Sequence, residues 1–166
     1  MTRVLLGLVI GAALLVAQGM LLAGAWGELP VEVAVHFGAD GVADGWGPKS
    51  SILWICGLVS VVALVCFHVP AVLIRWMPRR LLNFPNKAYW LAPERAASTV
   101  VRLQASMLRM GNISLAAGLM FTSGLLDANL AEEQKLSWLF IPCLLLYVAG
   151  VILWAFSLQR RFALPR

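Results

Sequence analysis

The sequence predicts an all-α integral membrane protein with four transmembrane helices and both termini in the cytoplasm. Three observations lead to this fold class: an excess of apolar residues, four long apolar segments, and charges sorted between the intervening loops. Of the 166 residues, 61% are hydrophobic and 13% are charged, whereas soluble domains average about 45–50% apolar and about 25% charged residues. The chain is therefore too apolar for a water-soluble globule and far too apolar to be disordered.

Four segments without a charge at their centres are long enough to cross a bilayer, which takes about 20 helical residues. We place these helices at about 4–26, 52–76, 110–130 and 138–156, in a single membrane domain of residues 1–166. The first segment has a basic start and an A-x-A-like end, as a signal peptide has. Its apolar run exceeds the roughly 7–15 residues of a signal peptide core, so we predict an uncleaved helix.

Basic residues are concentrated on alternate sides of these segments. Eleven of the 13 lysines and arginines lie before the first helix, between the second and third helices, or in the C-terminal tail; the other two are Lys49 and Lys135. A lysine and arginine excess marks the cytoplasmic side, so the termini and loop 77–109 are predicted inside and loop 27–50 outside. Tryptophans agree, because they prefer the membrane interfaces: Trp26, Trp54 and Trp138 fall at the outer one, and Trp76 and Trp154 at the inner one.

Other features exclude several function classes. The net charge of +5 does not indicate nucleic acid binding, because the basic residues flank apolar segments instead of forming a continuous surface. Cys56, Cys66 and Cys143 lack the spacing of a disulfide framework or a zinc site. We recognise no nucleophile–base pair and no phosphate-binding loop, and we expect no cofactor and no catalytic residue.

Several residues inside the apolar segments predict how the helices pack. Small residues four apart let helices approach closely in lipid, and two such pairs occur. Contact within the bundle is the favoured interpretation, and a homodimer interface is the alternative; the pairs are Gly7 with Gly11 and Ser114 with Gly118. Pro70 is expected to kink the second helix, because proline removes a backbone donor.

His68 and Asn112 are the conspicuous polar residues inside the apolar segments. Ionisable groups within a membrane are candidates for function. Both residues lie towards the predicted inner half, and no carboxylate lies at a similar depth, which argues against a proton relay.

The cytoplasmic loop 77–109 contains a basic amphipathic segment. Arg95, Arg102 and Arg109 recur every seven residues, and Pro93 suits the first position of a helix. Such a segment is predicted to lie against anionic lipids of the inner leaflet before turning into the third transmembrane helix. Docking onto a cytoplasmic partner is the alternative.

The outer loop 27–50 changes character after its first part. Residues 31–37 alternate as in a strand, and four glycines follow between positions 38 and 47. We predict a short extended segment followed by tight turns. His36, Asp40 and Asp44 are candidates to hold a divalent cation, and a histidine is able to report external acidity. The favoured interpretation is that these side chains hydrogen-bond within the loop.

Two motifs resemble the "domain of unknown function 1648" family of small multi-pass membrane proteins. The outer motif has the pattern L-P-x5-H-F-x3-G-x2-D-x4-K and comprises Leu29, Pro30, His36, Phe37, Gly41, Asp44 and Lys49. The inner motif has the pattern N-x-P-N-K-x-Y-W-x-x-P-E-R and comprises Asn83, Pro85, Asn86, Lys87, Tyr89, Trp90, Pro93, Glu94 and Arg95. The family is related to bacterial SdpI-type immunity and signalling proteins, which implies a bacterial inner membrane. SdpI-type proteins are usually longer, so the immunity role is not carried over.

Together these features favour a non-enzymatic membrane protein of the sensing, binding or signalling–immunity type. The outer motif is expected to engage a ligand or to hold the loop, and the inner motif to dock a cytoplasmic regulator or to anchor its loop at the headgroups. Engagement at residues 29–49 would shift the first two helices and reposition residues 79–104. The alternatives are a small accessory or structural subunit of a larger membrane complex and a metal-dependent membrane enzyme.

Overall fold

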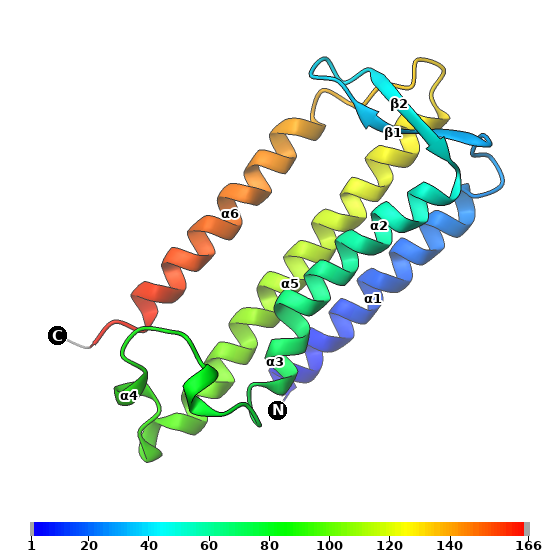
Figure 1. The fold of residues 1–166 in the computed structure, drawn as a ribbon. Helices are drawn as coiled ribbons and strands as arrows, with labels where there is room; N and C mark the ends of the chain where they lie inside the picture. The colour runs from blue at the N-terminus through cyan, green and yellow to red at the C-terminus, as the bar shows by residue number, and fades with distance from the viewer. Residues whose placement is uncertain (1, 165–166) are drawn as a thin grey trace.

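The computed structural model describes residues 2–164 and consists mainly of long helices that run side by side (Figure 1). Within these residues, four helical segments are long and apolar enough to cross a membrane, which indicates an integral membrane protein. They are α1 (Thr2–Ala25), a composite helix over Ser50–Leu73, α5 (Pro93–Leu130) and α6 (Phe140–Arg161).

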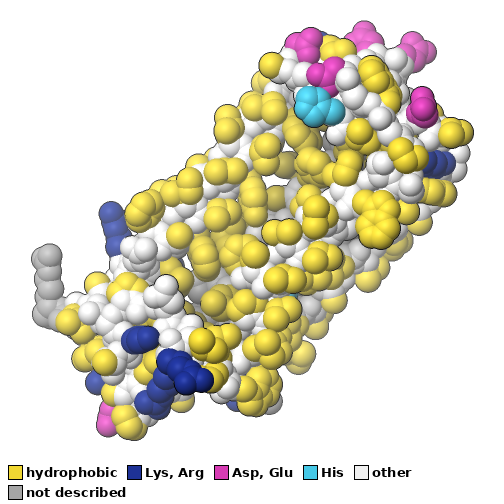
Figure 2. All heavy atoms as spheres, viewed as in Figure 1, with side chains coloured by type: hydrophobic (Ala, Val, Ile, Leu, Met, Phe, Trp, Pro, Cys, Tyr) yellow, Lys and Arg dark blue, Asp and Glu magenta, His cyan; other side chains and the backbone are white. Residues whose placement is uncertain are grey.

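The charged side chains divide the molecule into two ends. A β-hairpin crosses one end, which we call the hairpin end, and aspartates and glutamates gather there (Figure 2). Lysines and arginines gather at the opposite end, which we call the basic end and which also carries the start of α1 and the finish of α6 (Figures 1 and 2). The apolar side chains occupy the length between them, as expected for helices in lipid.

The composite helix contains the predicted irregularity at Pro70. It begins as α2 (Ser50–Ala63), passes through the π-helical turn η1 (Leu64–His68) and ends as α3 (Val69–Leu73). Proline has no N–H for the carbonyl four residues earlier and its ring crowds that carbonyl. The chain therefore meets Pro70 with a π-helical turn, in which the N–H of Val69 bonds to the carbonyl of Leu64, an irregularity often found at functional sites.

The amphipathic segment and the third transmembrane helix form one helix, which corrects the predicted turn between them. α5 extends from Pro93 at its first turn to Leu130 without interruption. Arg102 and Arg109 lower the hydropathy of its first half, but arginine is a good helix former, so the charge pattern does not end the helix. α6 likewise continues past the predicted position 156 to Arg161, because basic residues favour the last turn of a helix.

The fold is mostly helical but not all-α, because the predicted turns of the outer loop include a second strand. β1 (Glu32–Phe37) pairs antiparallel with β2 (Ala43–Pro48). Gly45 lies in β2 because a Cβ atom there would come within 2.9 Å of the Cβ of His36, and glycine is the residue that tolerates such a close approach. Gly41 makes the turn with a φ of 79°.

The small residues named in the sequence pack inside the bundle. A Cβ atom at Gly7 would lie 3.1 Å from the side chain of Leu108 in α5, and one at Gly11 would lie 2.7 Å from Nε2 of His68. Gly118 of α5 faces Val59 of α2. These contacts use the glycines to bring α1, α2 and α5 together, as the bundle interpretation expects.

Gly111 gives a sharp test of this packing. A Cβ atom there would lie 2.5 Å from Cε1 and 2.6 Å from Nδ1 of the buried His68 ring. We expect Gly111→Ala to destabilise the protein by about 1–3 kcal/mol, as overpacking does, measured as a lower midpoint of thermal unfolding in detergent. Gly57→Ala is the matched control, since no atom lies within 4 Å of its added Cβ. Equal midpoints for the two variants would contradict the close fit.

Candidate functional site

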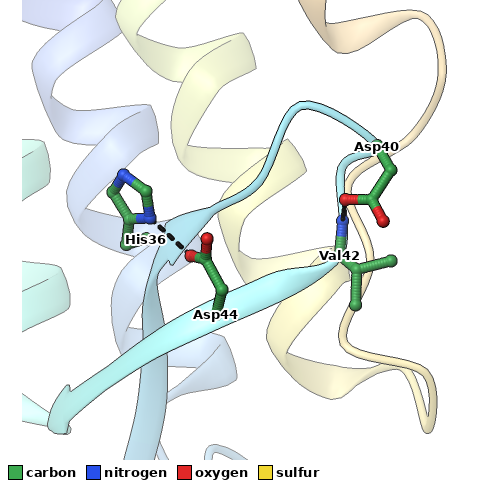
Figure 3. A network of polar contacts seen from close by, with 4 residues as sticks. All are labelled: His36, Asp40, Val42 and Asp44. Atoms are coloured by element: carbon green, nitrogen blue, oxygen red, sulfur yellow. Dashed lines mark hydrogen bonds and ion pairs between the residues drawn. The ribbon is translucent and has the colours of Figure 1, made fainter.

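The hairpin carries an exposed histidine–aspartate pair. Nδ1 of His36 in β1 contacts Oδ1 of Asp44 in β2, and their side chains are 73% and 52% exposed. Figure 3 shows the pair reaching across the two strands, while Oδ1 of Asp40 accepts a hydrogen bond of 3.1 Å from the backbone N–H of Val42 at the turn. The pair is thus presented to the surroundings, and Asp40 shapes the turn.

The metal candidates do not form a metal site in the described part of the chain. Among residues 2–164, no three His, Cys, Asp or Glu side chains are gathered closely enough to hold a metal ion. His36 and Asp44 meet, but Asp40 is used by the turn. This arrangement removes the geometric basis of the three-residue cation site proposed from the sequence.

The remaining residues of the outer motif hold the hairpin on the bundle. Leu29 is buried in a cluster with Ile52 and Leu125, and Phe37 packs against the same cluster. The Lys49 ammonium donates a 3.0 Å hydrogen bond to the carbonyl of Leu29 and lies 4.7 Å from the centroid of the Trp26 ring, a cation–π distance. Pro30 is exposed. Most of the outer motif is therefore explained by hairpin structure.

Asn129 of α5, which the sequence motifs do not include, forms two hydrogen bonds that hold the hairpin against this helix. Its Oδ1 accepts a 2.6 Å hydrogen bond from the N–H of Ala34, and its Nδ2 donates a 3.1 Å bond to the carbonyl of the same residue. Both residues are buried. One sequence feature could have pointed to Asn129: it is an amide residue at the end of an apolar helix, and a buried polar side chain needs a hydrogen-bond partner.

A second link joins the hairpin to the loop between α5 and α6. Nε1 of Trp46 donates a 2.9 Å hydrogen bond to Oε1 of Gln134, and the N–H of Ala43 donates to the Gln134 carbonyl at 3.1 Å. The N–H of Leu136 donates to the carbonyl of Gly41 at 2.9 Å. Both loops of the hairpin end thus form one hydrogen-bonded layer.

At the basic end, the inner motif holds the end of α6. It includes the short helix α4 (Lys87–Trp90) and follows the short helix η2 (Arg79–Leu81). Nδ2 of Asn86 and Nε1 of Trp90 both donate to the carbonyl of Phe162, at 3.0 and 2.8 Å. The rings of Trp90 and Phe162 meet edge to face, with centroids 5.5 Å apart.

The same motif is fixed to the start of α5. The Thr99 hydroxyl donates a 2.9 Å hydrogen bond to the carbonyl of Trp90, and Nε of Arg95 donates to the carbonyl of Tyr89 at 2.9 Å. The Arg95 guanidinium also stacks on the Tyr89 ring at 4.0 Å. Five residues of the motif are exposed and make none of these contacts: Asn83, Pro85, Lys87, Pro93 and Glu94. The Lys87 ammonium donates a 3.4 Å hydrogen bond to the carbonyl of Leu82.

Between the two ends, His68 and Asn112 belong to one hydrogen-bonded group. Nδ2 of Asn112 donates a 3.0 Å bond to the carbonyl of Gly7, so its Oδ1 is left to accept from Nε2 of His68 at 3.1 Å. No carboxylate takes part in these bonds. Nδ1 of His68 is buried and without a hydrogen-bond partner among the described residues, an uncommon state for a polar atom.

A second polar group, also missed from the sequence, is centred on Gln18. Its Nε2 donates to the Thr122 hydroxyl at 2.9 Å and to the Cys56 carbonyl at 3.2 Å, while its Oε1 accepts from the Ser60 hydroxyl at 2.5 Å. Gln18, Ser60 and Thr122 are all buried. The amide therefore joins α1, α2 and α5 at one depth.

Comparison with known proteins finds one family model that matches part of the chain. Residues 6–60 match the family model described as domain of unknown function (DUF1648). This segment runs from α1 through the hairpin into α2, so it includes the whole outer motif and ends before the inner motif. The predicted resemblance is thereby confirmed over this segment. No curated protein and no solved structure matches the chain.

Loss of the Asn129 side chain is expected to loosen the hairpin. Asn129→Ala leaves the N–H and C=O of Ala34 without their partners, a cost of about 1–3 kcal/mol for buried groups. Amide hydrogen exchange at Ala34 should then be faster by about tenfold or more. The control is Ser123→Ala on the same helix, whose exposed hydroxyl is 3.5 Å from Asp127. Unchanged exchange at Ala34 in Asn129→Ala would show that this clamp contributes nothing.

Proposed function

We propose that the protein is a membrane sensor or binding protein of a bacterial inner membrane, without enzymatic activity. The hairpin engages a ligand on the outer side, and α5 transmits that event to the inner motif in the cytoplasm. The observation that carries this proposal is that one helix is bonded to both motifs: Asn129 binds β1 and Thr99 binds the end of α4.

The length of α5 makes it a direct connection. Asn129 and Thr99 are 30 residues apart on one uninterrupted helix, which corresponds to about 45 Å at about 1.5 Å per residue. This route differs from a shift of the first two helices alone, because it needs no intermediate loop. A tilt or rotation of α5 moves both motif segments together.

The chemistry of the hairpin end favours a positively charged ligand. The His36–Asp44 pair is exposed, and exposed acids outnumber the one exposed base, Lys135, in the loops of this end: Glu28, Glu32, Asp40, Glu132 and Glu133. A surface on which one sign of charge predominates attracts the opposite sign and raises its local concentration. Trp46, 52% exposed, adds an aromatic face beside these acids, which suits a cationic group.

The proposed receiver of the signal is a cytoplasmic regulator at the basic end. Asn83, Pro85, Lys87 and Glu94 are exposed on the inner motif, whereas Asn86 and Trp90 are engaged by Phe162. A regulator that binds the exposed set would sense any movement of the segment. The proposed kinship with SdpI-type signalling proteins is consistent with this arrangement.

The orientation is tested by cysteine labelling in intact cells. A membrane-impermeant maleimide should label Asp40→Cys and should not label Lys87→Cys until the cells are permeabilised. The expectation follows from the basic residues, which mark the cytoplasmic side. Labelling with the two positions exchanged would overturn the proposed direction of signalling.

The coupling through α5 is tested at the inner motif after the hairpin has been loosened. In a background with alanine at the three native cysteine positions, we expect Asn129→Ala to change the labelling rate of Lys87→Cys several-fold. Ser60→Ala is the control for general loosening, because it removes a buried hydrogen bond to Gln18 far from the hairpin. If Asn129→Ala speeds exchange at Ala34 but leaves labelling at position 87 unchanged, α5 does not couple the ends, and the accessory-subunit interpretation gains.

A further inference from the structure

Four arginines line one cavity at the basic end. The cavity has a volume of about 330 Å³, and its lining includes Arg3 of α1, Arg102 and Arg109 of α5, and Arg161 of α6. Three helices thus direct positive charge to the same place. Like charges brought together destabilise a protein unless an anion compensates them.

Nothing within the described chain neutralises these arginines. Among residues 2–164, the one ion pair is His36 with Asp44, at the opposite end of the molecule. Most acidic residues gather at the hairpin end (Figure 2), and among residues 2–164 no aspartate or glutamate lines this cavity. The missing counter-charge points to a ligand.

An apolar groove between α5 and α6 starts beside this cavity. It has a volume of about 490 Å³, and its lining on α5 runs from Met110, next to Arg109, to Met120. Ten residues of helix correspond to about 15 Å, which is half the roughly 30 Å hydrocarbon core of a bilayer. The groove is therefore about as long as one leaflet is thick, which matches the length of a lipid acyl chain.

The loose packing of α6 explains why this groove is unfilled by side chains. α6 has no buried residue, whereas α5 has many. Along the groove α6 is held by two polar contacts, from Tyr147 to the Ser114 hydroxyl at 2.9 Å and from Trp154 to the Ser106 hydroxyl at 3.0 Å. Ser106 also lines the arginine cavity, so the polar and apolar spaces adjoin at this contact.

We infer that the cavity and the groove together form a binding site for one anionic phospholipid. The phosphate lies among the four arginines, and one acyl chain lies along α5 between Met110 and Met120. Basic pockets between transmembrane helices are suited to such headgroups, and arginine is suited to phosphate because its guanidinium presents paired donors. This site is independent of the proposed sensing by the hairpin.

The site is tested by native mass spectrometry of the full chain released from detergent. With added phosphatidylglycerol we expect one lipid retained per protein, and markedly less retention of phosphatidylcholine, whose headgroup carries no net charge. Arg102→Gln with Arg109→Gln should weaken phosphatidylglycerol retention by about tenfold or more, because each basic residue contributes to holding an anionic lipid. The charge-matched control is Arg80→Gln with Arg160→Gln, two residues at the basic end outside the cavity lining.

A second variant tests the groove and separates a lipid from a free anion. Gly150 lines the groove, and no atom lies within 4 Å of a Cβ added there, so Gly150→Phe fills the space without a clash at Cβ. We expect it to reduce phosphatidylglycerol retention while binding of inorganic phosphate is unaffected. Equal retention of both lipids, retention that survives the Arg102 and Arg109 substitutions, or inorganic phosphate displacing the lipid completely would each overturn the site.

Discussion

The hydrogen bonds made by polar side chains of α5 are the interactions on which the other elements depend. In hydrocarbon, a polar group must find its partner within the protein. α5 bonds directly to groups in most other elements, which are Gly7 of α1, Ala34 of β1, Ala71 of α3, Trp90 of α4, and Tyr147 and Trp154 of α6. α2 joins through Gln18, which bonds both Thr122 and the Cys56 carbonyl. Each bond contributes only about 0.6 kcal/mol on average in a membrane, so their value lies in fixing one arrangement.

These contacts divide the bundle into a tight part and a loose part. α1 approaches α5 closely at Gly7, where a Cβ atom would lie only 3.1 Å from the Leu108 side chain. α6 instead forms hydrogen bonds with α5 through two long side chains, Tyr147 and Trp154. Its end is held separately by the inner motif, through the bonds from Asn86 and Trp90 to Phe162. α6 is therefore held to α5 at separate points along its length. The proposed lipid would occupy the groove between these two helices.

Hydropathy and charge were sufficient to predict the four helices, because those signals are local in the chain. The pairing of β2 was not predictable in this way, because Gly45 is required by the nearby Cβ of His36 and not by a turn. The roles of Asn129 and Gln18 were also hidden, because their partners lie far away in sequence. His36 and Asp44 were recognised as neighbours in the loop, but only the strand register shows that they meet while Asp40 turns to Val42.

The hydrogen bonds from Asn129 to Ala34 connect the hairpin to a part of the chain outside the segment that the family model matches. The segment that matches the family model ends at residue 60, yet the strand within it is completed by an asparagine 95 residues further along the chain than Ala34. A chain that keeps this hairpin but ends or diverges after α2 must supply another amide, or another strand, to cover the same N–H and C=O. Within this chain the hairpin is therefore completed by the far end of α5, which lies outside the segment that the family model matches.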